Sequence, residues 1–218
     1  MNHKIHAAIV ATALATGGVL VWATADQPTT TAAMGSVPEA AADSGKGRVT
    51  EPLRAEHREL VPHIEALATA GDAVGTAPRA EQVEKVHASY EFLTKQLIPH
   101  AVAEDKVLYV EVNRLIGSNG STDATDTMVR DHTEVGRLTE RLGELADRLH
   151  DGELPPAEQQ DLRQVLYALN GIVDLHFAKE EEVYLPLLDR ELSAEEAAKM
   201  FEQMEKVTAS SGGTEHGH

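Results

Sequence analysis

The sequence predicts an all-α fold: an up-down four-helix bundle made from a duplicated pair of helices, with a short fifth helix at the C-terminus. Three observations support this fold class. Aromatic residues make up only 4% of the chain, so strands, which favour aromatic and β-branched residues, have little support. Long stretches carry apolar residues at the helical period. One segment also occurs twice, in altered form.

The repeated segment reads LIPHAVAEDKVL at residues 97–108 and VDLHFAKEEEVYL at residues 173–185. Each copy has a histidine four residues before a glutamate, and positions i and i+4 lie on one face of a helix. An imidazole and a carboxylate so placed can bind one metal ion or two neighbouring ions. The four residues are His100, Glu104, His176 and Glu180.

The segments upstream of the two copies also match. Glu56-His57 precedes the first copy and Asp131-His132 precedes the second, at almost equal distances. We therefore interpret the chain as two helix pairs, each with one histidine on its first helix and a His-x-x-x-Glu on its second. Two such pairs packed together would aim six potential metal ligands at the middle of a bundle. These are His57, His100, Glu104, His132, His176 and Glu180.

The four bundle helices are expected at residues 51–70, 80–115, 125–150 and 156–188. The first helix should begin after Thr50 as its N-cap, with Pro52 in its first turn, and Gly71 and Gly75 should close it. The second helix contains Pro99, so we expect a kink there, because proline lacks an N–H and its ring clashes with the carbonyl of residue i−4.

The later helix boundaries follow from turn and capping residues. A turn is expected at residues 117–121, residues 151–152 end the third helix, and two prolines precede the fourth. The apolar stripe of the fourth helix is expected to continue past Glu180 to Val183 and Leu187. Ser193 and Glu196 form a capping box that opens the fifth helix.

The chain divides into five regions on this basis. Residues 1–25 have a basic start, an uncharged apolar run and an Ala-x-Ala cleavage site, which together predict a signal peptide and a location outside the cytoplasm. The alternative is an uncleaved membrane anchor, since the run barely reaches the length that spanning requires. Then follow a disordered linker (26–50), the bundle (51–190), an accessory helix (191–207) and a flexible tail (208–218).

Composition excludes several classes of function. A net charge of −17 disfavours nucleic acid, whose phosphates would be repelled. The absence of cysteine removes disulfides, thiolate metal sites, iron–sulfur clusters and covalent haem attachment. A metal would have to be bound by histidine and carboxylate, a ligand set that suits iron or manganese and that zinc also accepts.

A glutamate at the centre of an apolar stripe needs a partner, because an ionised carboxylate buried without one is prohibitive. No Lys or Arg lies on the same stripes near Glu104 or Glu180, so a metal ion is the simplest partner that would neutralise them. The same spacing recurs in His87 and Glu91, but both fall on the polar face of their helix, which indicates a surface pair. Position on the apolar stripe, and not the spacing alone, therefore selects the candidate ligands.

Taken together, these motifs resemble the hemerythrin-like family, the HHE cation-binding domain, over about residues 50–190. The resemblance implies an up-down four-helix bundle that holds a non-haem di-iron centre of two iron ions. Each of the four stripe histidines would supply one imidazole. Glu104 and Glu180 would bridge the two ions, since each carboxylate has two oxygens. Iron is favoured over manganese and zinc on this basis.

The sequence departs from the oxygen-carrying hemerythrins on the third bundle helix. Those proteins have a second histidine four residues after the first, where this chain has Gly136. His63, at the edge of the first stripe, is an alternative source of that ligand. Asp105 and Glu181 follow the motif glutamates and are expected behind the ligands or on the surface. Ferritin-like di-iron proteins need Glu-x-x-His on two helices, and no glutamate lies three residues before any of the four histidines.

Three function hypotheses remain open at the level of sequence. The first is an exported metal-binding protein whose di-iron centre binds or senses oxygen or another small diatomic ligand, or handles iron. The second is an enzyme that uses the same centre to consume peroxide or nitric oxide. The third is a metal-free helical interaction module in which the histidines are polar core residues. A membrane is a partner only if the N-terminal segment stays uncleaved, and protein partners are not indicated.

Overall fold

The computed structural model describes residues 47–117 and 124–211. Within these ranges the regular structure is helical and contains no strand, which confirms the expected all-α fold. The expected signal segment, the linker up to residue 46, the turn residues 118–121 and the last part of the tail lie outside the described residues.

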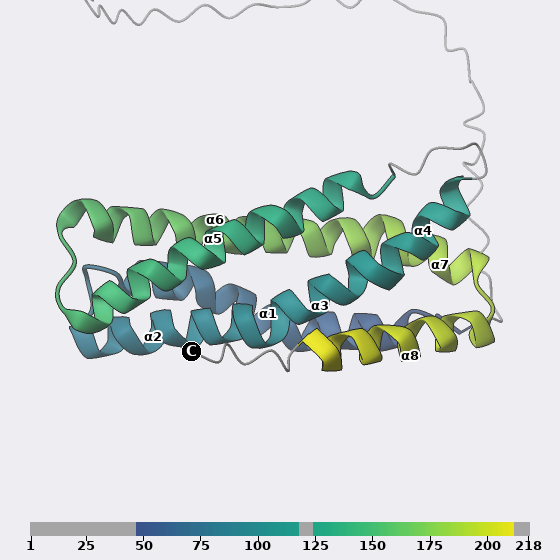
Figure 1. Cartoon of the computed structure of the whole chain (residues 1–218), viewed down its shortest axis with the longest axis horizontal. Coiled ribbons are helices and arrows are strands. Elements are labelled where there is room, and N and C mark those ends of the chain that lie inside the picture. The colour runs from purple at the N-terminus through teal and green to yellow at the C-terminus, as the bar shows by residue number, and fades with distance from the viewer. Residues whose placement is uncertain (1–46, 118–123, 212–218) are drawn as a thin grey trace, which may run out of the picture. The chain divides into compact units, whose positions relative to one another are not determined.

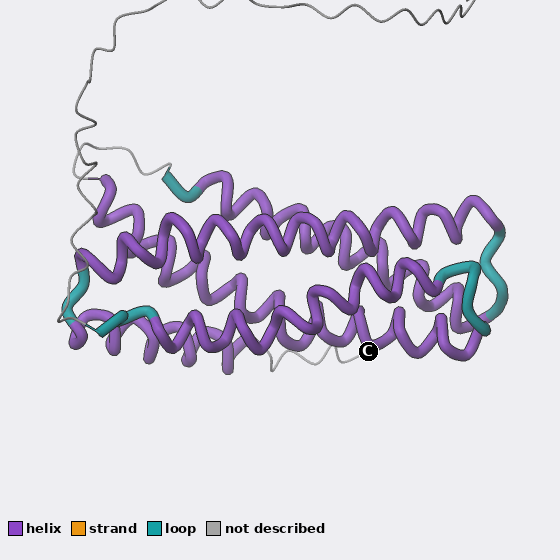
Figure 2. Tube along the Cα trace, turned by 180° about the vertical axis from the view of Figure 1, so that it is seen from behind, coloured by secondary structure: helices purple, strands orange, loops and turns teal. Residues whose placement is uncertain are grey.

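Four long helical stretches form the bundle (Figures 1 and 2). The first is α1 (Glu51–Ala73), and the third is α5 (Asp126–Asp151). The second stretch comprises α2 (Arg79–Phe92), η1 (Leu93–Leu97), α3 (Ile98–Ala103), η2 (Glu104–Leu108) and α4 (Tyr109–Ile116). The fourth comprises α6 (Pro156–Lys179), η4 (Glu180–Tyr184) and α7 (Leu185–Glu191). Because α1 packs on α2 and α6, and α5 packs on the same two helices, the four stretches close into a ring.

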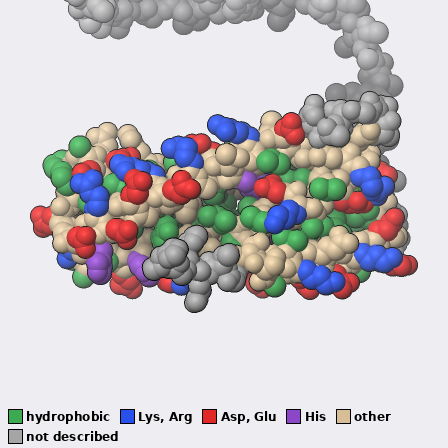
Figure 3. All heavy atoms as spheres, viewed as in Figure 1, with side chains coloured by type: hydrophobic (Ala, Val, Ile, Leu, Met, Phe, Trp, Pro, Cys, Tyr) green, Lys and Arg blue, Asp and Glu red, His purple; other side chains and the backbone are tan. Residues whose placement is uncertain are grey.

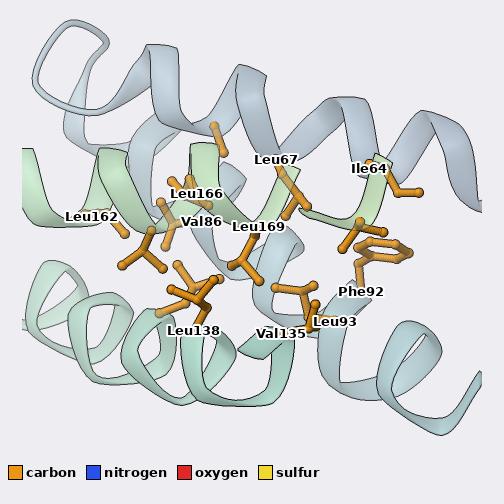
Figure 4. Close-up of a cluster of buried hydrophobic side chains, with 14 of the residues drawn as sticks. Ile64, Leu67, Val86, Phe92, Leu93, Val135, Leu138, Leu162, Leu166 and Leu169 are labelled. Atoms are coloured by element: carbon orange, nitrogen blue, oxygen red, sulfur yellow. The ribbon is translucent and has the colours of Figure 1, made fainter. Parts of the chain in front are cut away.

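Two apolar clusters fill the interior of this ring. The larger core, part of which Figure 4 shows, gathers leucine, valine and phenylalanine side chains from α1, α2, α5 and α6. The smaller core lies among the other ends of the four stretches and α8 (Ala194–Ser211). On α1, Leu53 belongs to the smaller core and Leu60 to the larger one, so His57 lies between them. The other candidate ligands lie at the same level of the bundle, between the two apolar clusters.

The beginning of α1 is tied to the far end of the chain. Thr50 occupies the expected N-cap position, but its side chain makes no capping hydrogen bond. Instead its backbone N–H and its hydroxyl both donate to Asp189 Oδ1 of α7, each at 2.9 Å. Val49 packs against the smaller core. The expectation of a disordered linker up to residue 50 is therefore wrong for these last two residues, because they pack against the bundle.

The closure of α1 comes slightly later than expected. Gly71 lies inside the helix, which runs to Ala73, and Gly75 turns the chain with a φ of 74°. That left-handed conformation is accessible to glycine without the steric cost that a Cβ would bring.

Three π-helical turns interrupt the second and fourth stretches. At η1 the Ile98 N–H bonds to the Leu93 carbonyl, five residues back, directly before Pro99. This wide turn is the form that the kink expected at Pro99 takes. The other two, η2 and η4, each begin at a candidate ligand, Glu104 and Glu180. Such turns shift the helical register of every residue that follows.

The register shift corrects the apolar stripe predicted for the fourth stretch. Val183 was expected to be buried but is 58% exposed, and Leu187 is only partly buried. Leu185 and Leu188 are fully buried in their place. The prediction failed because it continued the α-helical period through η4, where the π turn adds one residue.

The fifth helix is longer than expected. It extends to Ser211, beyond the boundary drawn at residue 207, so the expected loose tail is wrong for residues 208–211. Its capping box forms as predicted, since Ser193 N–H donates to Glu196 and Glu196 N–H donates back to the Ser193 hydroxyl. Met200 and Met204 are buried where α8 packs on α3 and η2.

The surface mixes both signs of charge. On the face in Figure 3, acidic and basic side chains alternate with patches of apolar surface. Among the described helices, none combines the length and the apolar character that crossing a membrane requires.

The π turn at η4 predicts which residues contribute to the free energy of unfolding. Leu185→Ala should lower the free energy of unfolding by about 2–5 kcal/mol, because it empties a fully buried leucine site. Val183→Ala, at an exposed position, should change it by less than about 0.5 kcal/mol. Urea unfolding of both variants measures the difference. A larger loss for Val183→Ala would mean that the α-helical period continues unbroken through residue 184.

Candidate metal centre

The structure brings the six predicted ligand residues together in the middle of the bundle. They form two groups whose potential ligand atoms all lie within 4.8 Å of one another. We call the first group half-site 1, consisting of His57, His100, Glu104 and Glu180. Half-site 2 consists of Glu104, His132 and His176. His132 is partly buried and the other five residues are buried, so this is an interior site.

The Glu104 carboxylate lies between the two half-sites. Its Oε1 is 2.9 Å from His100 Nε2 and 3.8 Å from His57 Nε2. Its Oε2 is 3.4 Å from His132 Nε2 and 4.0 Å from His176 Nε2. One oxygen therefore faces each half-site.

The Glu180 carboxylate is divided in the same way. Its Oε2 is 3.6 Å from His57 Nε2, in half-site 1. Its Oε1 is 3.7 Å from His176 Nε2, in half-site 2. Both carboxylates thus have the geometry that bridging two cations requires.

Most of the atoms that face the centre lack hydrogen-bond partners. Although the distances above are short, five buried atoms are not in hydrogen-bonding geometry with any group: His57 Nε2, His100 Nε2, both Glu104 oxygens and Glu180 Oε2. Buried polar atoms without partners are costly. Metal–ligand bonds of roughly 2.1 Å place neighbouring ligand atoms roughly 3.0 Å apart and opposite ones roughly 4.2 Å apart. The observed separations of 2.9–4.0 Å fall close to this range, so the residues fit a pair of metal ions.

Each histidine is oriented from behind by a carboxylate. In each case the Nδ1 atom of the ring contacts a carboxylate oxygen. In half-site 1, His57 is 2.9 Å from Glu181 and His100 is 3.0 Å from Glu56. In half-site 2, His132 is 2.8 Å from Asp105 and His176 is 3.2 Å from Asp131. Because an ionised carboxylate only accepts, Nδ1 carries a proton, and Nε2 can offer a lone pair inward whenever the imidazole is neutral. Such partners fix the orientation of a ligating imidazole and raise its basicity.

These contacts place Asp105 and Glu181 behind the ligands, one of the two positions expected for them. Sequence reasoning noticed Glu56 and Asp131 only as neighbours of ligands. Their role follows from tertiary structure, since each one orients the histidine of the paired helix and not the histidine beside it.

Two cations pair with two of the four outer carboxylates and with neither of the inner ones. Arg54 is buried and pairs with Glu181 and Asp189, while Lys179 pairs with Asp131. In the described part of the chain, no Lys or Arg forms an ion pair with Glu104 or Glu180. Among the described side chains, the two inner carboxylates thus have only imidazoles as possible cationic partners.

A small void adjoins both half-sites. Its volume is about 10 Å³, roughly the space that one water-sized molecule needs. Four candidate ligands line it, and the rest of its wall is apolar, made by Leu97, Ala101, Val135, Val173 and Phe177. Phe177 also stacks on the His57 ring, with the centroids 4.3 Å apart. The interior of the site therefore has room for a very small molecule only.

Tyr109 is a site residue that sequence reasoning missed. Its hydroxyl donates to Glu180 Oε1 at 2.6 Å and lies 3.0 Å from His176 Nε2. Burial beside Glu104 and Glu180 raises the pKa of the phenol far above its usual range. The α-helical period counted from Glu104 selects Leu108, and only the π turn η2 brings Tyr109 round to the site. No signal in the sequence marks that turn.

Two other histidines named by the sequence lie outside the centre. His63 is exposed and stacks on Phe92, so it does not replace the histidine missing at Gly136. His87 and Glu91 are 3.5 Å apart and largely exposed, which agrees with their interpretation as a surface pair. A Cβ placed on Gly136 would meet nothing within 4 Å, so the space beside this glycine is open.

A comparison with protein families identifies the family of the chain. The model of the hemerythrin HHE cation-binding domain matches residues 48–188 and, in a second match, residues 123–210. The chain belongs to the hemerythrin HHE cation-binding domain family. The first match covers all six residues of the centre, and the second begins before α5. No curated protein and no solved structure matches the chain.

Protons balance part of the charge in the HHE domain when no metal is bound. Burial opposes the charged form of His100, but Glu104 and Glu56 outweigh it and raise the His100 pKa well above its usual range. Burial also opposes the charged form of His132, but Asp105 and Glu104 outweigh it and raise the His132 pKa to about 9. Burial, together with the charge of Glu104, raises the pKa of Glu180 well above its usual range.

The pKa values of two other ligands shift in the opposite direction. Burial lowers the pKa of His176 to about 4. Burial alone would raise the pKa of Glu104, but the charge of His100 and the other imidazoles close to the carboxylate hold it well below its usual range. At neutral pH the metal-free HHE domain therefore has a neutral His176 and an anionic Glu104.

Metal binding to the HHE domain should release protons at pH 7. A metal ligand must be deprotonated, and His132, with a pKa of about 9, is protonated at that pH. The apparent affinity should therefore rise between pH 7 and pH 9, as the fraction of protonated His132 falls. Calorimetric titration in two buffers of different ionisation enthalpy measures the release. Equal heats in both buffers would show that no proton is displaced.

Proposed function

We propose that this chain is an exported HHE-domain protein whose centre holds two iron ions and binds or senses dioxygen or another small diatomic molecule, or handles iron. One observation carries the proposal: each of two buried carboxylates, Glu104 and Glu180, turns one oxygen to each half-site. A single ion would leave at least one oxygen of Glu104 without a partner, and of the four oxygens only Glu180 Oε1 has a protein donor, the Tyr109 hydroxyl. Two ions use all four.

The ligand chemistry supports iron. The centre offers four imidazole nitrogens and two carboxylates and no sulfur, a mixture that suits iron and is shared by manganese and, less well, by zinc. When bound, a di-iron centre supplies redox chemistry toward small oxygen-containing molecules, which none of the side chains here can supply. The four outer carboxylates would keep the imidazoles aimed at the ions.

The small ligand follows from the size and character of the void. At about 10 Å³ between the half-sites, it has no room for an organic substrate. Its apolar wall suits an uncharged diatomic molecule, because a charged or strongly polar one would lose its hydration without gaining partners. The unpartnered inner atoms also count against a metal-free interaction module.

Export is supported by the sequence alone. The basic start, the apolar run and Ala23-Thr24-Ala25 are typical of a signal peptide. The mature chain would then begin at Asp26 and acquire its metal outside the cytoplasm. N-terminal sequencing of the protein from culture medium or periplasm should give Asp26 as the first residue. Recovery of an intact Met1 in the membrane fraction would favour the anchor.

Metal content tests the centre itself. Protein prepared with iron available should contain about two iron ions per chain, since the two half-sites share both carboxylates. His100→Ala and Glu104→Ala should lose iron and thermal stability together, because metal binding energy is partly folding energy. Elemental analysis and thermal unfolding measure both effects.

His87→Ala is the matched control for this experiment. It removes a histidine from the same His-x-x-x-Glu spacing on the same helical stretch, but on the exposed face. Its iron content and stability should equal those of the unmodified chain. The same iron content in all three variants would overturn the assignment of the ligands.

A further inference from the structure

We propose that Tyr109 is a seventh protein ligand, whose phenol oxygen binds the metal ion of half-site 2 together with His132 and His176. This inference rests on the proposed function, because it concerns the same centre. It goes further in making the two ions chemically unequal, with a phenolate on one of them only.

The position of the hydroxyl is that of a ligand atom. Tyr109 Oη is 3.0 Å from His176 Nε2 and 2.6 Å from Glu180 Oε1. His176 Nε2 is in turn 2.9 Å from His132 Nε2. Neighbouring ligand atoms around one ion are expected roughly 3.0 Å apart. The three contacts therefore describe edges of one coordination sphere.

The hydroxyl has no other role that the structure shows. Both of its polar contacts are to candidate ligands, and the side chain is 1% exposed. The phenol ring stacks on the His132 ring, with the centroids 5.6 Å apart, which holds the oxygen at this level of the bundle. Tyr184, the last residue of the π turn η4, instead donates to the carbonyl of Ala124.

The backbone is shaped to bring Tyr109 to this place. The Tyr109 N–H bonds to the Glu104 carbonyl five residues back, so the two residues are related as i and i+4 are in an α-helix. On an unbroken α-helix, Tyr109 would point well away from the face that carries Glu104. The π turn therefore aligns the phenol with the bridging carboxylate.

Half-site 2 gathers one candidate ligand fewer than half-site 1. Glycine at position 136, one turn beyond His132 on α5, provides no side chain there. In the other half of the repeat, the position equivalent to Tyr109 is Leu185, a core residue with no donor atom. Tyr109 thus supplies an oxygen to half-site 2, and the equivalent residue of the other repeat, Leu185, supplies none to half-site 1.

The chemistry of binding is a simple replacement. The ion takes the place of the hydroxyl proton, the oxygen lone pair forms the metal bond, and the proton leaves to solvent. A phenolate is a hard anionic oxygen, and tyrosine is an established iron ligand in proteins. Such a ligand favours the ferric over the ferrous state of the ion that it binds.

The test is spectroscopic and does not depend on activity. The unmodified chain loaded with iron and oxidised to the ferric state should show a visible phenolate-to-iron charge-transfer band, with resonance-enhanced phenolate vibrations. Tyr109→Phe should bind iron but lose the band and the vibrations. Tyr184→Phe is the matched control, since it also removes one tyrosine hydroxyl contact close by, and it should keep both signals.

Labelling gives an answer that needs no variant. Growth with ring-deuterated tyrosine should shift the same vibrations in the unmodified chain, and of the four tyrosines only Tyr109 contacts the centre. Iron bound without phenolate vibrations, or vibrations that persist in Tyr109→Phe, would overturn the inference and leave the di-iron proposal standing. An unmodified chain that takes up no iron would overturn both.

Discussion

Two fully buried carboxylates in the middle of an apolar bundle dominate the design of this protein. Glu104 and Glu180 are each 0% exposed, and no Lys or Arg in the described ranges pairs with either of them. Leaving ionised carboxylates in such a place without cations would be prohibitive. Successive layers of side chains surround the two carboxylates. The imidazoles come first, the outer carboxylates lie behind them, and Arg54 and Lys179 pair with two of the outer carboxylates. The chain is thus organised from its charged centre outward.

The centre also divides the hydrophobic interior. On each of the four helical stretches, the candidate ligands lie between residues of the larger core and residues of the smaller core, as His57 does between Leu60 and Leu53. The smaller core depends on α8, which packs against η2, the turn that begins at Glu104. Metal bound at this level would join two apolar regions that otherwise meet across a layer of charge. The stability of the fold and occupancy of the site are therefore linked.

The sequence predicts that these six residues gather in the middle of the bundle, although the π turn η1 already interrupts the second stretch before His100. His57, His132 and both His-x-x-x-Glu pairs could be placed on apolar stripes by the 3.6-residue period alone. Prediction fails directly after Glu104 and Glu180, where π turns begin, and this is why Val183 was placed inside and Tyr109 was overlooked. Which carboxylate lies behind which histidine could not be predicted, since pairs such as His57 with Glu181 join residues that only the closed bundle brings together.

Duplication within one chain has a consequence for the symmetry of the centre. An assembly of two identical helix pairs would have identical half-sites, because every residue would occur in both. Fusion into one chain lifts that constraint, and the copies have diverged: Phe177 in the second repeat corresponds to Ala101 in the first. Both side chains line the void, and a second phenylalanine in place of Ala101 would fill it. The void thus depends on a difference between the two copies, a methyl group in one where the other has a ring.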